Sequence, residues 1–177
     1  SNHYHLAVRT ARVPLWRTMR LVQGRFAKGY NRRHQVYGPL WQGRYKATLV
    51  TGGQHLRQVI AYIHLNPVRV GEVKEAWEFR WSSAAAYVGK VPLPSYLSVA
   101  VVLGLFGRRP TTARRHYAAF LRDVDKNVIK PWAAVEGQFL LGERAWIERM
   151  KRRLSRRGLP EESTARSALQ VRPPLSL

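Results

Sequence analysis

The stretch Ala61-Tyr62-Ile63-His64-Leu65-Asn66-Pro67-Val68-Arg69 lies at the end of the segment with the clearest helical pattern in the chain. Apolar residues at helical spacing predict a helix from about Gln54 to Leu65. We expect Asn66-Pro67 to end it, because the residue before a proline avoids helical dihedral angles. Tyr62 and Asn66 are four positions apart and therefore share one helix face. His64 points to another side, and we interpret it as a packing or solvent-facing residue.

The pair Tyr62 and Asn66 has two interpretations. A tyrosine hydroxyl can attack a phosphorus atom as a covalent nucleophile, while a neighbouring amide oxygen binds a metal that polarises the phosphate. Alternatively, Tyr62 packs in the core with its hydroxyl satisfied, and Asn66 caps the C-terminal end of the helix. The local pattern alone leaves both interpretations open.

The segments around this helix suggest a mixed chain. Alternating residues predict strands at Asn2–Val8 and Leu40–Val50, with a helix over about 14–30 between them. After the central helix, residues 68–89 are rich in turns, with a helical turn at 82–87. Further helices are expected over 95–106, 111–124 and 143–156. We place a domain boundary near residue 90, a helical basic extension over 91–156 and a disordered tail over 157–177.

A histidine pair stands near the start of the chain. His3 and His5 flank Tyr4 in the predicted strand, where residues two apart point to the same face. Two imidazoles on one face can chelate a divalent metal. The alternative is that both are ordinary surface histidines of a basic protein.

The charge balance indicates a polyanionic partner. Lys and Arg number 31 against 10 Asp and Glu, which gives a net charge of +21. Nucleic acid is the first expectation, because binding phosphates releases condensed counterions. An anionic membrane surface and a ribosome-like structural role are the rivals. There is no cysteine, so disulfides and zinc fingers of the cysteine type are excluded. No apolar run approaches the roughly 18 residues of a membrane span.

A histidine motif and four later phrases of the sequence together carry a family resemblance. Asn2-His3-Tyr4-His5-Leu6 resembles the histidine–hydrophobic–histidine motif of the single-tyrosine HUH transposases, in the branch associated with repetitive extragenic palindromes. The later phrases follow in the family's order: Tyr30 to His34, Leu40 to Lys46, the 62–69 stretch and Trp81-Ser82-Ser83. The resemblance covers about residues 1–90. Gly137-Gln138 through Gly142 is similar to an extension in part of the family.

The resemblance implies an α+β fold, a ferredoxin-like HUH nuclease domain over residues 1–90. His3 and His5 match the metal-binding histidines, Tyr62 the nucleophile, and Asn66 the third metal ligand, where glutamine is usual. The implied reaction is transfer of single-stranded or hairpin DNA through a 5′-phosphotyrosine link, with Mg²⁺ or Mn²⁺ as cofactor. Imidazole ligands favour Mn²⁺. A homodimer and a cytoplasmic, nucleoid-associated location are also implied.

The chain departs from the family at its start. Members carry a strand, a helix and a strand before the histidine motif, and we expect that this upstream segment is missing here. Basic residues interleaved with aromatics in the motif phrases suggest a DNA-binding groove: Arg32, Arg33, Arg44, Lys46 and Arg69. The alternative for them is a solvated loop. A DNA-binding protein without catalysis, either a transposase remnant or a domesticated transposase, is the second function, and an RNA-binding structural protein is the third.

Overall fold

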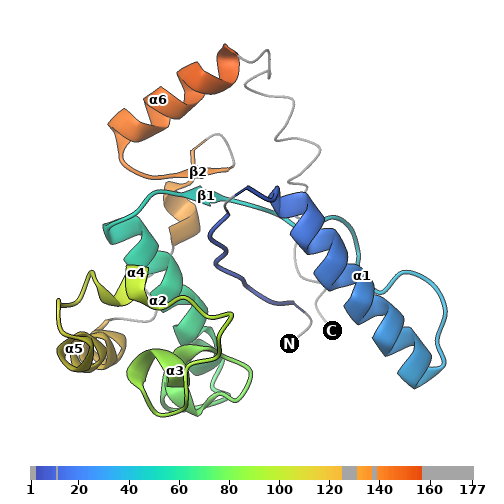
Figure 1. Cartoon of the computed structure of the whole chain (residues 1–177), viewed down its shortest axis with the longest axis horizontal. Coiled ribbons are helices and arrows are strands. Elements are labelled where there is room, and N and C mark those ends of the chain that lie inside the picture. The colour runs from blue at the N-terminus through green and yellow to red at the C-terminus, as the bar shows by residue number, and fades with distance from the viewer. Residues whose placement is uncertain (1–2, 11, 125–130, 137–138, 157–177) are drawn as a thin grey trace. The chain divides into compact units, whose positions relative to one another are not determined.

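The computed structural model describes residues 3–10, 12–124, 131–136 and 139–156. The chain forms two compact units (Figure 1). The first unit combines Ser1–Ala7 with Thr48–Arg153, and the second combines Val8–Ala47 with Leu154–Leu177. Each unit is described by itself below.

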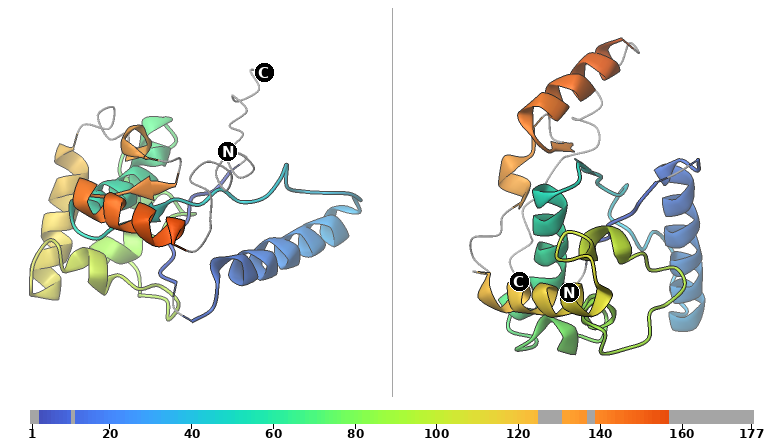
Figure 2. Two further views of the ribbon diagram at one scale, coloured as in Figure 1. Left: turned by 90° about the horizontal axis from the view of Figure 1, so that it is seen from above. Right: turned by 60° about the vertical axis from the view of Figure 1, so that its left-hand side comes forward.

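The core of the first unit surrounds one long helix, α2, which runs from Gln54 to Arg69. Its inward residues pack against short elements and helices that follow in sequence, as the grouping of α2, α3 and α5 in Figure 2 illustrates. These elements are η1 (Ala76–Glu78), α3 (Ala84–Val88), α4 (Ala100–Leu103) and α5 (Pro110–Asp123). Burial of this apolar surface is the main stabilising contribution to the unit.

A second, smaller cluster joins the start of α2 to the later part of the chain. Strand β1 (Leu49–Val50) pairs in parallel with β2 (Leu140–Leu141), and helix α6 (Arg144–Ser155) follows β2. A short helix, η2 (Pro131–Ala134), precedes β2. Gly142 is required here, because a Cβ atom at this position would lie 2.6 Å from Thr51 Cγ2 and 2.7 Å from Trp146 Cε3.

The second unit consists of helix α1 (Leu15–His34) and the segment that folds back on it. Trp41 packs against Phe26 with ring centroids 5.7 Å apart, and its Nε1 donates to the Gln23 carbonyl at 3.2 Å. The Asn31 side chain donates to the Gly38 carbonyl at 3.0 Å. Among the described residues, no helix combines the length and the apolarity needed to cross a membrane.

Most predicted helices are confirmed with shifted ends. The helix predicted over 14–30 is α1 and continues to His34, the one over 111–124 is α5, and the one over 143–156 is α6. The helical turn at 82–87 is α3. The helix predicted over 95–106 is wrong in extent, since only Ala100–Leu103 is α-helical there.

The prediction that Asn66-Pro67 ends the central helix is wrong. Pro67 lies inside the last turn of α2, and the helix ends at Arg69. A proline in the last turn removes one backbone donor but leaves later ones in use. The N–H of Val70 donates to the Asn66 carbonyl at 3.2 Å, and the N–H of Glu72 donates to the Pro67 carbonyl at 2.9 Å. Tyr62 therefore lies in the middle of a helix rather than near its end.

Both predicted strands are largely wrong. Residues 3–8 form no strand, and within the predicted strand Leu40–Val50 only Leu49–Val50 is one. Alternation of residues cannot make a strand without a partner that completes its hydrogen-bond ladder, and in the described part of the chain the only ladder joins β1 and β2. A helix-rich fold with a little β-structure fits the coarse α+β prediction, whereas the ferredoxin-like arrangement stays a prediction.

Packing is continuous across residue 90, where the sequence suggests a domain boundary. Ala113, Tyr117 and Leu121 of α5 lie in the same buried cluster as Ile60 and Leu65 of α2. The helical extension beyond residue 90 therefore shares a core with the motif-bearing helix. The predicted tail over 157–177 lies outside the described residues.

A buried polar network ties α2 to this core. His64 is 1% exposed, and its Nδ1 shares a hydrogen bond of 2.6 Å with the Tyr117 hydroxyl. Its Nε2 shares one of 2.8 Å with Ser83 Oγ. Both ring nitrogens thus have partners, as burial of a polar side chain requires. Of the two interpretations of His64, packing is confirmed.

Burial lowers the pKa of His64 from 6.5 to about 3. The unfolded chain takes up a proton on this residue as the pH falls below 6.5, while the folded chain does so only near pH 3. The network therefore stabilises fully above pH 6.5, and its contribution is lost as the pH falls through that window, by about 1.4 kcal/mol per pH unit.

We predict that His64→Gln is less stable than the wild type at pH 7 but loses less stability between pH 7 and pH 4.5. The free energy of urea unfolding at several pH values is the measurement. His116→Gln is the matched control, because His116 is exposed and its Nδ1 hydrogen-bonds to the backbone carbonyl of Phe106 at 2.8 Å. An equal loss of stability in the wild type and His64→Gln would contradict the assignment.

Candidate active site around Tyr62

The structure brings His5 into contact with Tyr62, and His3 into contact with His5. The rings of His5 and Tyr62 contact edge to face, with centroids 5.4 Å apart, and those of His3 and His5 do so at 5.1 Å. All three belong to the first unit. His5 contacts Tyr62 although residues 3–8 do not form the predicted strand.

The outward face of α2 supplies the rest of the cluster. Successive helical residues turn by about 100°, which places Tyr62, Asn66 and Arg69 on one face and His64 on the opposite one. The guanidinium carbon of Arg69 lies 5.1 Å from the centre of the Tyr62 ring. Asn66 is half-buried one turn after Tyr62, and its backbone carbonyl accepts from Val70. The role of the Asn66 amide as a ligand stays a prediction.

The electrostatics of the cluster keep His5 neutral. Burial lowers the pKa of the His5 imidazole, and the nearby His3 and Arg69 lower it further. A neutral imidazole is the form that binds a metal. The cluster is otherwise cationic, since Arg69 is its charged group, so an anionic ligand such as a phosphodiester suits it.

The residues present fit a divalent metal only in part. His5 Nε2 is buried and has no hydrogen-bond partner, which is a polar atom that a metal would satisfy. The 5.1 Å between the His3 and His5 rings is compatible with two nitrogens about 2.1 Å from one ion. In the described part of the chain, however, no three His, Cys, Asp or Glu residues form a metal-binding group. Further ligands would have to be an amide such as Asn66, water or the DNA itself.

The five predicted DNA-binding residues divide between the units. Arg69 contacts Tyr62 in the first unit. Arg32 and Arg33 lie in the last turn of α1, and Arg44 and Lys46 in the segment after it, all exposed in the second unit. Their grouping into one groove with Tyr62 stays a prediction.

The second unit has a cationic surface that the sequence analysis did not single out. No Asp or Glu precedes Glu72 in the chain, so every ionised side chain of α1 is basic. One side of α1 gathers four of these bases around a shallow hollow lined by Arg17, Arg20, Leu21, Gly24, Arg25 and Lys28. Cations along one helix side provide phosphate affinity without sequence selectivity.

Sequence reasoning missed two side chains near the proposed chemistry. Trp132 of η2 lies 5.6 Å from Tyr62 and 6.4 Å from His5, measured between ring centroids. His55 lies on the same face of α2 as Tyr62, two turns earlier, and its Nδ1 is buried without a partner. No motif marks Trp132, which stands 70 positions after Tyr62. His55 could have been found because it stands seven residues before Tyr62, a spacing that places both on one helix face.

Comparison with known proteins adds no relative. No protein-family model matches the chain, no curated protein matches it, and no solved structure matches it. The sequence motifs and the geometry around Tyr62 are therefore the observations that bear on function.

We predict that His3→Ala and His5→Ala each weaken Mn²⁺ binding by more than about tenfold, because either change leaves a single imidazole in the pair. Isothermal titration calorimetry with MnCl₂ is the measurement, and His116→Ala is the control for a histidine outside the pair. Unchanged Mn²⁺ affinity in both variants would return the two histidines to the role of ordinary surface residues.

Proposed function

We propose that the chain is a transposase-like DNA strand transferase that nicks and rejoins single-stranded or hairpin DNA. The observation that carries the proposal is the contact of Tyr62 with both a metal-competent histidine and an arginine. A nucleophile, a metal ligand and a phosphate-binding cation are the groups that phosphoryl transfer needs. The histidine motif, the four later phrases and the net charge of +21 support the same function.

In the proposed reaction, the Tyr62 hydroxyl oxygen forms a bond to the phosphorus of a DNA phosphodiester. The bond from phosphorus to the 3′ oxygen breaks, and that oxygen takes the proton that the phenol gives up. The products are a 5′-phosphotyrosine and a free 3′-hydroxyl. Attack by the 3′-hydroxyl of a second strand reverses the step. One phosphoester replaces another each time, so no external energy source is needed.

Each neighbour of Tyr62 has a role in this scheme. Arg69, whose guanidinium already lies over the Tyr62 ring, binds the non-bridging oxygens of the phosphate. His3 and His5, with Asn66, would hold the divalent metal, and the lowered pKa of His5 keeps its nitrogen available. When bound, Mg²⁺ or Mn²⁺ would polarise the phosphodiester and ease formation of the phenolate.

A DNA-binding protein without catalysis is the second candidate. The observation that favours it is the cationic side of α1, which binds phosphate without any need for the Tyr62 cluster. Both candidates bind DNA, and only the first forms a covalent complex with it. A possible homodimer is compatible with either.

We predict that Tyr62→Phe abolishes covalent attachment to single-stranded DNA and leaves affinity within about twofold, because only the hydroxyl is the nucleophile. The assay is a denaturing gel with a labelled oligonucleotide and Mn²⁺, alongside a filter-binding measurement. Tyr96→Phe is the matched control, since Tyr96 belongs to the same unit and is 87% exposed.

A covalent band that survives in Tyr62→Phe would refute the nucleophile, and Tyr45 and Tyr30 would be tested next. Salt-sensitive binding with no covalent band in the wild-type chain would favour the second candidate.

A further inference from the structure

Trp132 joins the Tyr62 cluster from a distant part of the sequence. Its indole stands edge to face with the Tyr62 ring, at an interplanar angle of 83°, and is close to parallel with the His5 ring, at 23°. It nevertheless remains 40% exposed. A large aromatic surface is thus open to solvent directly beside the proposed nucleophile.

The chain holds Trp132 through the cluster around β1 and β2. Pro131 is buried, and the Trp132 carbonyl accepts from the N–H of Val135 at 3.3 Å. Farther on, Glu136 N–H donates to the Leu140 carbonyl at 2.8 Å, next to the pairing of β2 with β1. Because β1 leads directly into α2, the strand pairing brings η2 to the helix that carries Tyr62.

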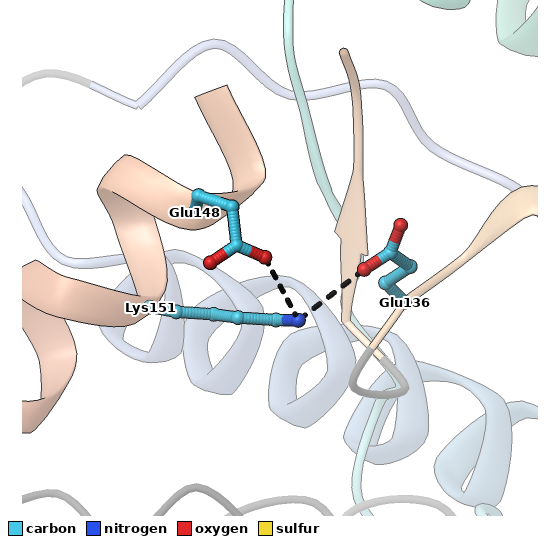
Figure 3. Close-up of polar contacts among 3 residues, drawn as sticks. All are labelled: Glu136, Glu148 and Lys151. Atoms are coloured by element: carbon cyan, nitrogen blue, oxygen red, sulfur yellow. Dashed lines mark hydrogen bonds and ion pairs between the residues drawn. The ribbon is translucent and has the colours of Figure 1, made fainter. Parts of the chain in front are cut away.

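A second connection runs through helix α6. Figure 3 shows Lys151 reaching from α6 between Glu136 and Glu148, at 3.3 and 3.5 Å. The hydrogen bond to Glu136 raises the pKa of Lys151. Such exposed ion pairs add little stability, but this one links α6 to the segment that follows Trp132. Two connections thus hold the segment that follows Trp132, and the buried Pro131 directly precedes the indole.

An exposed indole at this place suits one ligand chemistry. Nucleobases in single strands stack on aromatic side chains, whereas bases inside a duplex already stack on one another. The cation Arg69 and the exposed ring of Trp132 both contact Tyr62, so a phosphate and its neighbouring base would each meet a complementary group.

We propose that Trp132 is a substrate-positioning residue that stacks on the base next to the phosphate attacked by Tyr62. The inference rests on the proposed strand-transfer function and deepens it. It makes η2 part of the substrate site, together with α2 and His5. It also assigns the preference for single-stranded DNA to a particular side chain.

The test measures stacking separately from chemistry. The full chain with Tyr62→Phe binds an oligonucleotide that carries 2-aminopurine, whose fluorescence is quenched when it stacks on an aromatic ring. We expect Trp132→Ala in this background to weaken binding by roughly 5- to 100-fold and to remove the quenching. Trp132→Phe should retain most of both, because a ring face remains.

Two further variants serve as controls. Trp132→Leu keeps an apolar side chain without a ring face, so it should behave like Trp132→Ala if stacking is what matters. Trp81→Ala removes an indole that is 78% exposed and that has the Arg80 guanidinium over its ring. This change should alter DNA affinity by less than about twofold. Thermal unfolding by circular dichroism checks that all variants fold.

The outcomes separate this inference from the proposed function. A wild-type chain that forms the covalent complex while Trp132→Leu binds and quenches normally would overturn the stacking role alone. In a chain that retains Tyr62, faster covalent attachment by Trp132→Ala would also overturn the stacking role. Trp132 would then shield Tyr62 from the DNA. Loss of binding and quenching in Trp132→Leu, with no covalent complex in the wild type, would support stacking and refute strand transfer.

Discussion

The hydrogen bonds of His64 set the orientation of α2, and the candidate site depends on that orientation. A buried imidazole without partners would destabilise the fold, so the bonds to Tyr117 and Ser83 allow only one side of the helix to face the core. With His64 inward, Tyr62 and Arg69 lie on the opposite side of the helix, where Arg69 is exposed and Tyr62 is half-buried at the edge of the core cluster. The buried His64 and the residues of the proposed site thus lie on opposite faces of the same helix.

The candidate site draws its parts from three distant segments. His5 comes from the first residues, Tyr62 from α2 and Trp132 from η2, and their rings contact one another in pairs. Burial keeps His5 neutral, while Arg69 brings a positive charge to the Tyr62 ring. A neutral imidazole and a cation thus lie beside Tyr62, and the proposed function uses the first for a metal and the second for a phosphate.

The sequence predicts the helices far better than the strands, because helical periodicity is local and strand pairing is not. The pattern around α2 placed Tyr62 and Asn66 on one helix face, as the structure has them, but it ended the helix too early at Pro67. His5 was expected near Tyr62 from the family resemblance, although the predicted strand carrying it does not form. Trp132 could not be predicted, since the pairing of β1 with β2 that brings it to α2 involves two residues from each strand.

The most direct test of the central claim is to locate the DNA on the protein by mass spectrometry. After reaction with a short oligonucleotide and Mn²⁺, followed by nuclease and trypsin, the peptide 58–69 contains Tyr62 as its single tyrosine. The account predicts that this peptide carries the mass of a 5′-linked nucleotide. A nucleotide on a peptide that holds another tyrosine, or none on any peptide from protein that has bound the DNA, would contradict it.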